Sequence, residues 1–320
     1  MKLFVNNLDL SELVERVVWS GDTRQVARKL EFTIVSKATD YYLPKPKLTA
    51  GDPVILKDDA GAVVFGGILF DIDKSGAANT TSYLAFDFLF YINNSEINRI
   101  FDNTAETITA EVCKELGVNF GGAAPTGIKV YMPCLNKNGY EAIMMAYTYA
   151  GRANGKKYIP IMKDIDKLWV IEKGSLCDVV LNGDYNLIDA NYKISLQNLV
   201  NKVLIVDKTG KVVGKIQDSE STGKYGTIQK VYTQEDGKDA KAAAQAMLQS
   251  IERSSSVSGI SDIRAKSGYA LVIEEPITGL LGKFYIESDT HTFENGSSTM
   301  ELSLAFENIM DEKEIENEEE

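Results

Sequence analysis

Histidine is almost missing from the sequence, and this scarcity removes much of the enzyme repertoire. His291 is the single histidine among 320 residues, whereas histidine is the usual general base near neutral pH and the commonest metal ligand. A Ser-His-Asp or Cys-His pair would have to use His291, and no serine lies in a Gly-x-Ser-x-Gly signature. The composition therefore favours a binding or assembly role over catalysis.

Cysteines and long apolar runs are also few. Cys113, Cys134 and Cys177 are separated by 21 and 43 residues, which is not zinc-ligand spacing, and their odd number argues against a disulfide framework. We expect reduced, mostly buried thiols and synthesis in a cytoplasm. The first residues turn polar too early for a signal peptide. The longest apolar run, 62–70, is shorter than the ~18 residues of a membrane span, so we expect no membrane insertion.

The charge is predominantly negative, with a formal net charge of −12. Such a chain is a poor ligand for nucleic acid, because binding to phosphate depends on Lys and Arg releasing counterions. Residues 311–320 contain seven acids, one lysine and one apolar residue. This segment has too little apolar surface to repay the entropy of ordering, and we predict a disordered acidic tail.

Residues 1–102 have the pattern of strands. Leu30, Phe32 and Ile34 alternate with polar residues, as in a half-buried strand. The runs 54–57 and 62–65 flank a glycine-containing turn and predict a hairpin. Two adjacent glycines, 66–67, then interrupt a strand and indicate a bulge or a sharp bend. These patterns predict a small barrel or sandwich.

A small α+β part is expected at 103–190. Asn103 and Glu106 have capping-box spacing, and a helix is predicted from there to Leu116. A second helix begins near Asn138 and ends at the glycines 151 and 155. A pair of strands, 157–161 and 167–172, is predicted to follow. A second β-rich part, 191–310, contains one long helix predicted from Asp239 to Glu252 and closes with three strands, 270–274, 282–289 and 299–306.

Five groups of residues have features of a functional site. Two pairs of acids, Asp71 with Asp73 and Asp164 with Asp166, have the spacing of a paired-carboxylate site, but solvated strand ends and loops explain them better. Asp289 and His291 share one face of a strand, so the carboxylate could orient the imidazole. Because no nucleophile or metal-ligand set accompanies them, we predict a structural role. No catalytic, cofactor-binding or metal-binding residue is predicted.

The remaining groups are aromatic or glycine-rich. Tyr140, Tyr147 and Tyr149 lie on or near one helix and could form a carbohydrate platform, although core packing is the favoured interpretation. The glycines of 117–127 follow a helix, whereas a phosphate loop needs them between a strand and a helix start. That segment is interpreted as a linker.

The order of several motifs resembles a known family. The run Thr278–Ile286, then Ser288–Phe293, Asn295-Gly296 and Met300–Leu304, is similar to the C-terminal region of the baseplate hub proteins of contractile phage tails and R-type bacteriocins. The match is to the XkdQ-like group of prophage tail proteins, which is distantly similar to the late-control-D hub proteins. Earlier in the chain, further elements occur in the family's order: 201–203, 224–226 and the alanine-rich helix after Asp239.

The resemblance implies a structural assembly protein without a cofactor. It implies a homotrimer in which two β-barrel tube domains per chain, 1–102 and 191–310, form a pseudo-sixfold ring, with 103–190 as an α+β domain between them in sequence. The implied partners are the tail tube, the central spike and the baseplate wedges, with no specific nucleic-acid binding. Such a protein is made in the bacterial cytoplasm, joins the phage or bacteriocin baseplate and is released on lysis. The alternatives are a tail-associated peptidoglycan hydrolase or a carbohydrate-binding tail protein.

Overall fold

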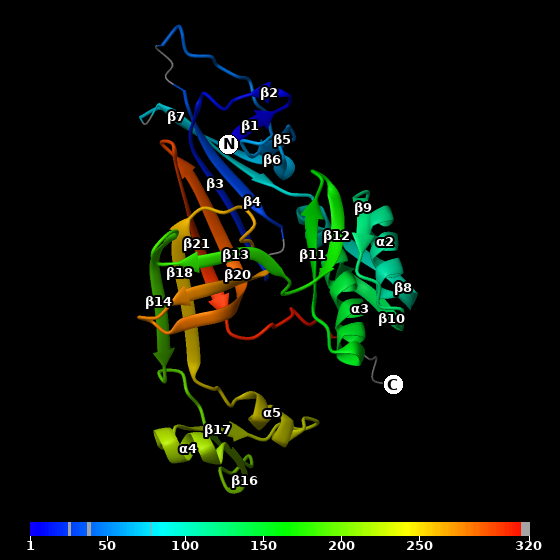
Figure 1. The fold of residues 1–320 in the computed structure, drawn as a ribbon. Helices are drawn as coiled ribbons and strands as arrows, with labels where there is room; N and C mark the ends of the chain where they lie inside the picture. Colours follow the sequence, from blue (N-terminus) through cyan, green and yellow to red (C-terminus); the bar gives the residue numbers. More distant parts are fainter. Residues whose placement is uncertain (25–26, 37–39, 78, 315–320) are drawn as a thin grey trace. The chain divides into compact units, whose positions relative to one another are not determined.

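The structure is a computed structural model that describes residues 1–24, 27–36, 40–77 and 79–314. The chain divides into two compact units: unit 1 holds Met1–Ala190 and Ser256–Glu320, and unit 2 holds Asn191–Ser255. Strands predominate in unit 1 (Figure 1), as the alternating apolar patterns predicted. No helix among the described residues is long and apolar enough to cross a membrane.

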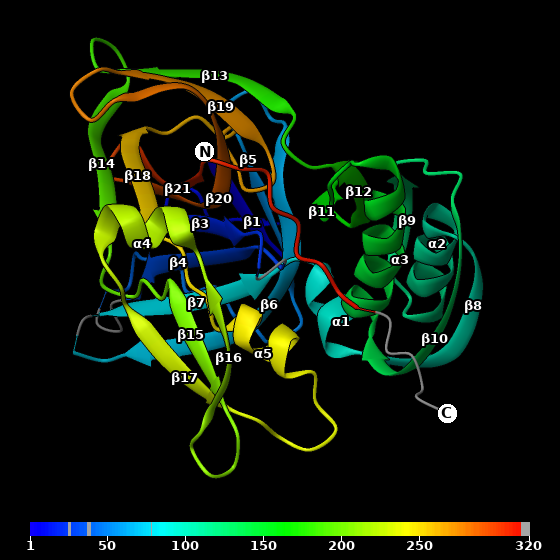
Figure 2. The same cartoon turned by 90° about the horizontal axis from the view of Figure 1, so that it is seen from below.

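One large sheet contains most of the strands. Its path runs β14-β18-β21-β20-β3-β4-β7-β6-β5-β1-β2, with β19 paired to β20 and β13 paired to β19. The sheet curls strongly (Figure 2), and β14 and β18 each run across a boundary of unit 2. The thirteen strands are β1 (Lys2–Val5), β2 (Leu8–Asp9), β3 (Val14–Asp22), β4 (Lys29–Val35), β5 (Pro53–Lys57), β6 (Val63–Ser75), β7 (Thr80–Phe86), β13 (Leu176–Asn182), β14 (Leu187–Ser195), β18 (Glu252–Ile260), β19 (Ala270–Glu275), β20 (Leu280–Glu294) and β21 (Ser297–Ala305).

Apart from β2, which pairs with β1 at one end, the sheet consists of two halves with the same strand order. The first half reads β3-β4-β7-β6-β5-β1 and the second reads β14-β18-β21-β20-β19-β13. When the six strands of each half are numbered along the chain, both halves have the spatial order 2-3-6-5-4-1. They differ at one edge, where β1 is antiparallel to β5 and β13 is parallel to β19. The chain thus contains a topological repeat that is not visible in its residues.

The β-rich fold is as expected, but the strands are divided differently from the expected parts. β13 lies within 103–190, where only the α+β part was expected. Unit 2 interrupts 191–310 between β14 and β18. β3 pairs with β20 and joins the two halves into a continuous sheet. The two-barrel arrangement therefore stays a prediction.

The core of the first half confirms the period-2 pattern. Leu30, Phe32 and Ile34 are buried on one face of β4, and Phe32 stacks on Tyr83 of β7 with ring centroids 4.9 Å apart. Burying each such side chain contributes about 1.5–3 kcal/mol. Trp19 of β3 is buried in the same cluster.

The predicted bend at the glycine pair corresponds to a change of partner along β6. The strand pairs with β5 up to Ile68 and with β7 from Ile68 onward. A Cβ on Gly67 would lie 2.2 Å from the Phe86 carbonyl oxygen, and one on Gly66 would lie 2.5 Å from that of Ile165. Only glycine fits where these backbones approach so closely.

The α+β part lies at one side of the large sheet (Figure 1 and Figure 2). It holds two small sheets, β8-β10 and β11-β12-β9, around a core that includes buried Ile108, Ile143 and Tyr147. Its elements are α1 (Leu89–Asn94), β8 (Glu96–Thr104), α2 (Ala105–Glu115), β9 (Asn119–Ala123), β10 (Lys129–Asn138), α3 (Gly139–Asn154), β11 (Tyr158–Lys163) and β12 (Lys167–Glu172).

The two helices expected here form, with one difference in capping. The capping box of Asn138 and Glu141 is present, and α3 ends at Gly155 with φ 74°. By contrast, α2 begins after Thr104 and not at Asn103. The side-chain amide of Asn103 donates to the Glu111 carboxylate at 3.0 Å. Asn103 therefore contacts a residue within α2 and does not form the predicted N-terminal cap.

The expected disorder of 311–320 differs from the structure at its first residues. Tyr140 donates its hydroxyl proton to Asp311 at 2.8 Å, and Glu312 accepts from Arg152 at 2.9 Å and Lys157 at 3.0 Å. Residues 311–312 therefore contact α3 and Lys157 through a hydrogen bond and ion pairs, which a count of apolar residues does not detect. Residues 315–320 lie outside the described residues.

Unit 2 is a small α+β module with its own core. Its sheet has the order β16-β15-β17, and Val203, Ile205 and Ala244 are buried together. Its elements are β15 (Lys202–Val206), β16 (Val212–Gln217), α4 (Ser219–Tyr225), β17 (Gln229–Thr233) and α5 (Ala240–Ala246). The long helix predicted from Asp239 to Glu252 is wrong in length, because Gln249 pairs as an extended residue with Val200.

Candidate functional site

A buried ion pair lies in the middle of β20. The Asp289 carboxylate is fully buried, and Arg28 binds both of its oxygens, with Nη1 3.0 Å from Oδ1. The backbone N–H of Ser267 donates to Oδ1 at 2.6 Å. The guanidinium carbon of Arg28 lies 4.0 Å from the Trp19 ring centroid. Burial acts to raise the pKa of Asp289, but the charge of Arg28 and the hydrogen bonds from His291 and Arg28 hold it well below its usual range.

His291 extends this network and is itself fully buried. Its Nε2 lies 2.9 Å from the carbonyl oxygen of Ala265, and its Nδ1 lies 2.8 Å from the hydroxyl of Ser261. A carbonyl oxygen can only accept, so Nε2 carries a proton and donates it. For a neutral ring, Nδ1 then accepts from Ser261. The Asp289 Oδ2 is 3.4 Å from Nε2, and the ring lies 5.1 Å from that of Trp19.

The structure thus adds a hydroxyl to the Asp289–His291 pair that the sequence singled out. Ser261 lies 30 residues before His291 in the chain, and no local motif marks it. The three side chains are those of a Ser-His-Asp triad, in which the carboxylate hydrogen-bonds the ring nitrogen that is remote from serine. Here that nitrogen has the Ala265 carbonyl as its nearer acceptor, and the carboxylate is held by Arg28. We interpret the network as a polar crosslink between β20, Arg28 just before β4, and the 261–267 loop.

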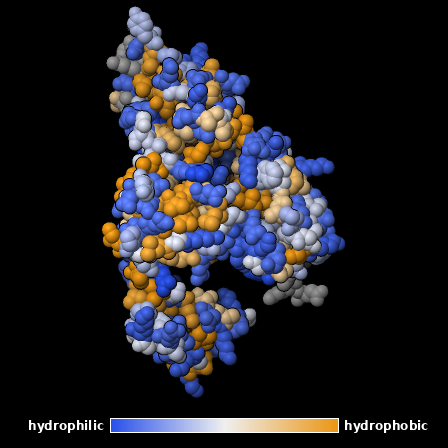
Figure 3. Space-filling view, in the orientation of Figure 1, coloured by the Kyte–Doolittle hydropathy of each residue, from blue (hydrophilic) through white to orange (hydrophobic). Residues whose placement is uncertain are grey.

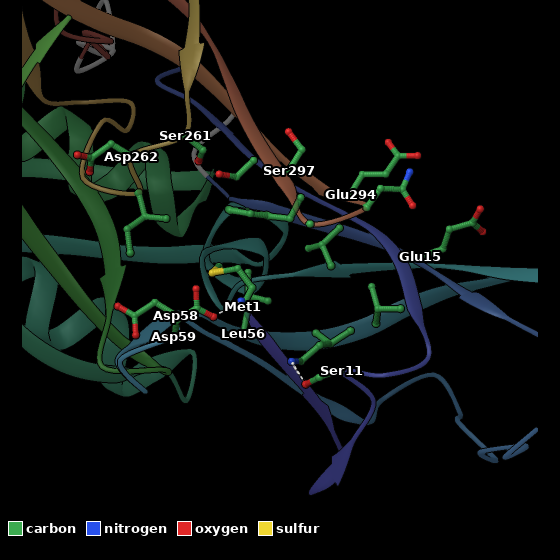
Figure 4. Close-up of a pocket in the computed structure, with 18 residues that line it drawn as sticks. Met1, Ser11, Glu15, Leu56, Asp58, Asp59, Ser261, Asp262, Glu294 and Ser297 are labelled. Carbon is green, nitrogen blue, oxygen red and sulfur yellow. Dashed lines mark hydrogen bonds and ion pairs between the residues drawn. The ribbon is translucent and has the colours of Figure 1, made fainter. Parts of the chain in front are cut away.

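A cavity of about 590 Å³ adjoins Ser261. Figure 4 places Asp58, Asp59 and Met1 toward one end of the cavity and Glu15 toward the other. The amino group of Met1 binds Asp59, and the hydrogen bond and charge of that ammonium lower the pKa of Asp59. The cavity is lined by Met1, Leu3, Ser11, Val14, Glu15, Val17, Leu56, Asp58, Asp59, Ser261, Asp262, Ile263, Phe293, Glu294, Asn295, Gly296, Ser297 and Ser298.

The lining of the cavity is acidic but does not assemble a metal centre. Asp262 is paired with Arg264 at 2.6 Å, and this contact lowers the pKa of Asp262. In the described part of the chain, no group of three or more His, Cys, Asp or Glu side chains could hold a metal ion. Ser261 lines the cavity, so a molecule in the cavity could reach its hydroxyl. No Lys or Arg side chain is among the described residues that line the cavity.

The other candidates from the sequence do not converge on this site. Asp71 and Asp73 are exposed on the second half of β6, and Asp164 lies in the turn between β11 and β12. Tyr140 and Tyr147 are buried, which removes two of the three rings of the suggested carbohydrate platform. Tyr140 and Tyr147 instead pack the core, as the favoured interpretation predicted, whereas Tyr149 is 50% exposed.

Asp87 is a buried acid that the sequence reasoning missed. It is 2% exposed, and its Oδ1 accepts from the N–H of Leu89 at 3.0 Å at the start of α1. Its Oδ2 has no hydrogen-bond partner among the described residues. Burial raises the pKa of Asp87 to about 7, against the lowering effects of Arg28 and Leu89. Its aromatic neighbours in sequence, Phe86 and Phe88, were the available signal.

The face of unit 1 that Figure 3 shows does not mark a further functional site. In the space-filling view of Figure 3, apolar and polar side chains are interspersed over unit 1. Exposed apolar residues occur on β8 and β10, where Ile100 and Tyr131 are 56% and 66% exposed. Nothing in the described residues indicates what would cover them.

Comparisons with known proteins extend over nearly the whole chain. A family model described as YQBQ-like matches residues 17–305. The phage-like element PBSX protein XkdQ of Bacillus subtilis (strain 168) is 25% identical over 342 residues, covering 98% of this chain and 99% of that protein.

Solved structures support the fold. The 43 kDa tail protein of prophage MuSo2 from Shewanella oneidensis has a TM-score of 0.68 at 14% identity, covering 95% of this chain and 97% of that one. The E. coli c3393 protein, a component of the type VI secretion system described as similar to the T4 tail proteins gp27 and gp5, has a TM-score of 0.53 at 10% identity. This match covers 95% of the chain and 76% of that protein. The fold is that of phage tail proteins.

Proposed function

The chain belongs to the YQBQ-like family, and from this premise we propose that it is the baseplate hub of a contractile phage tail or tail-like bacteriocin. In this proposal three copies form a pseudo-sixfold ring that joins the tail tube to the central spike. The baseplate wedges attach around the ring, and the chain is a structural component of the particle.

The observation that carries the proposal is the repeated strand order of the large sheet. A sixfold tube can be matched by three chains only if each chain presents two similar surfaces. The halves β3-β4-β7-β6-β5-β1 and β14-β18-β21-β20-β19-β13 share one strand order, and this repeat supports two such surfaces in one chain. In the proposal each half is a tube domain, and unit 2 is an insertion between two strands of the second.

The end-to-end similarity to XkdQ and the tail-protein fold support the same role. The formal net charge of −12 fits a ring that does not bind nucleic acid tightly, because phosphate binding needs clustered Lys and Arg. The proposal needs no cofactor and no catalytic residue.

A density map of the isolated tail tip tests the proposal. We expect three copies of this chain in a ring between the tube and the spike, with the two halves in equivalent positions. A ring with another copy number, or a location outside the tube axis, would contradict the hub role. Quantifying the chain against the tube protein in sheared tails gives an independent count.

A second candidate, peptidoglycan hydrolysis, is favoured by one observation. Ser261 lies 2.8 Å from His291 Nδ1 and borders the cavity, so its hydroxyl could give up its proton to the ring. We expect no clearing of peptidoglycan by the purified chain. Clearing that Ser261→Ala abolishes, with folding retained, would favour the hydrolase instead.

A further inference from the structure

The two halves correspond residue by residue at their long strands. In β6 the register with β7 shifts by one residue between Leu69 and Asp71, and in β20 the register with β21 shifts between Ile286 and Ser288. Aligning these bulges places Asp73 of β6 at the position of Thr290 of β20. A β-bulge is a specific local feature, so its recurrence at the same point supports the alignment.

Backbone hydrogen bonds outside the long strands agree with this correspondence. Ser36 N–H donates to Asn79 at 2.7 Å, and at the matching position Ser261 N–H donates to Ser298 at 3.2 Å. On the next strand pair, the Val35 N–H donates to Leu13 at 3.2 Å. Its counterpart is the bond from the Ile260 N–H to Asn186, at 2.8 Å. β14 is therefore the counterpart of β3.

The exposure pattern aligns β14 with β3 more closely. Two consecutive residues, Glu15 and Arg16, are exposed in β3 where its register with β4 shifts. The counterpart in β14 has two consecutive exposed residues, Ile188 and Asp189, after which the exposure alternates as far as Lys193. A strand alternates strictly unless a bulge intervenes. This alignment places Lys193 at the position of Ser20.

The halves differ in what covers one strand edge. In β20 the edge opposite β21 pairs with β19 up to Tyr285 and then with β3 from Ser288 to Glu294. In β6 the edge opposite β7 pairs with β5 only up to Ile68. Over Asp71–Lys74 no strand among the described residues covers that edge. At the other end of the sheet, β18 is the one strand of the described residues that pairs with β14, so no described strand pairs with its outer edge.

We infer that these two edges bind each other between copies of the chain. The β14 strand of one copy pairs antiparallel with β6 of the next, as β3 pairs with β20 within a chain. The internal partners Thr290 and Ser20 fix the register, which sets Asp73 opposite Lys193 of the next copy. The occupant of each edge is thus a second copy of this chain.

The charges at the two edges agree with this register. Asp73 and Lys193 are both exposed in the single chain, and the contact joins a carboxylate to an ammonium. Opposite charges facing each other across antiparallel strands contribute about 0.2–1 kcal/mol. Most of the affinity would come from the backbone ladder, because an uncovered strand edge is a template for another strand.

The contact is heterologous, so copies add in one direction and can close into a ring. Because each contact between copies repeats the geometry of the contact within a chain, successive halves are related by similar rotations. The closure at three chains rests on the proposed hub function, whereas the strand register does not.

Cysteine crosslinking tests the register in the full chain. The variant Asp73→Cys/Lys193→Cys is made with Cys177→Ser, because Cys113 and Cys134 are buried. Paired positions on neighbouring antiparallel strands bring Cα atoms to about 5 Å, within disulfide reach, whereas a shift of two residues does not. Oxidation with diamide should therefore link separate chains into dimers and trimers on a non-reducing gel.

Two matched variants serve as controls. Ser20→Cys/Thr290→Cys occupies the same register inside one chain and should form a disulfide without linking chains. Asp71→Cys/Lys193→Cys is displaced by two residues and should link chains at least tenfold less. If the internal control forms and the Asp73–Lys193 pair links no chains at high concentration, the inferred interface is wrong. A three-copy ring in the tail map would then leave the hub function standing, whereas crosslinking without such a ring would overturn only that function.

Discussion

At the scale of single residues, Arg28 decides whether Asp289 is tolerated in the core. The carboxylate is fully buried and accepts from Arg28 and from the Ser267 N–H. Removing one partner of a buried ion pair leaves an uncompensated charge. We expect Arg28→Met to lower the free energy of unfolding by about 3–5 kcal/mol, measured by urea denaturation at neutral pH. The double variant Arg28→Met/Asp289→Asn should recover part of this loss, and no recovery would contradict the account.

His291 is expected to act through its hydrogen bonds. His291→Ala leaves the buried carbonyl of Ala265 and the hydroxyl of Ser261 without their partner, which costs about 1–3 kcal/mol for each group left unsatisfied. We predict lower thermal stability or impaired assembly. Ser261→Ala removes one bond and should cost less. If His291→Ala instead left assembly intact and abolished a lytic activity of the particle, the structural role would be wrong.

Asp87 should make stability depend on pH. Burial raises its pKa to about 7, so between about pH 4 and pH 7 the unfolded chain releases this proton while the folded chain retains it. The protonated Asp87 therefore contributes fully to the free energy of unfolding at low pH. This contribution is lost as the pH rises, by up to about 4 kcal/mol. Relative to the natural chain, Asp87→Asn should therefore become more stable as the pH increases from 5 to 8, as monitored by melting temperature. Asp73→Asn, at an exposed position, is the control, and parallel pH profiles for both variants would contradict the prediction.

At the scale of residues, the sequence predicted correctly which side chains share a face of a strand, because side chains alternate between the two faces. The common face of Asp289 and His291 follows from their spacing, and both are indeed in one network. Ser261 and Arg28 reach the same network from distant segments. Only the pairing of strands brings them there, so no local pattern identifies them. The sequence did not identify Asp87 as a buried acid, because its burial depends on packing against residues distant in the chain.

At the scale of elements, local signals predicted α3 well and α5 poorly. The capping box at Asn138 and the left-handed Gly155 both act within a single turn of chain. The alanine-rich segment has high helix propensity, yet α5 ends at Ala246 because the following residues pair in extended form. Tertiary pairing outweighs propensity differences of less than about 1 kcal/mol per residue.

The segment after Met310 illustrates a contact made by charge. Asp311 and Glu312 contact Tyr140, Arg152 and Lys157 on or near α3. Exposed ion pairs contribute about 0–1 kcal/mol each. We expect a truncation after Met310 to fold and assemble, with a loss of at most about 2 kcal/mol in unfolding free energy. Arg152→Ala in the full chain is the matched control. Loss of spike or wedge attachment in the truncation would identify the segment as a docking element.

At the scale of the whole molecule, the sequence indicated two β-rich parts but not their boundaries. The repeat has the same strand order while its paired positions carry different residues, such as Asp73 and Thr290. Each half of the large sheet needs only apolar residues at alternate positions, so equivalent strands can diverge without losing the fold. Insertions between strands then hide the repeat further, and unit 2 is one of them.

The position of unit 2 makes a prediction about the whole fold. In the first half β3 and β4 are joined by a short connection, 23–28, whereas in the second half unit 2 lies between β14 and β18. Unit 2 has its own core of Val200, Val203, Ile205 and Ala244. A module that buries its own apolar side chains contributes little to the packing of the sheet that carries it.

Replacing residues 198–250 by a short Asn-Gly turn should therefore leave the large sheet folded. The turn joins two antiparallel neighbours, as in a hairpin, and a shorter loop lowers the entropy cost of closing it. We expect circular dichroism and urea denaturation of the shortened chain to show one cooperative transition within about 2 kcal/mol of the full chain. The test of assembly is separate: interchain crosslinking at Asp73 and Lys193 should persist, because neither strand edge is removed. Collapse of the cooperative transition would mean that unit 2 is required for the fold of the second half and is not an insertion into it.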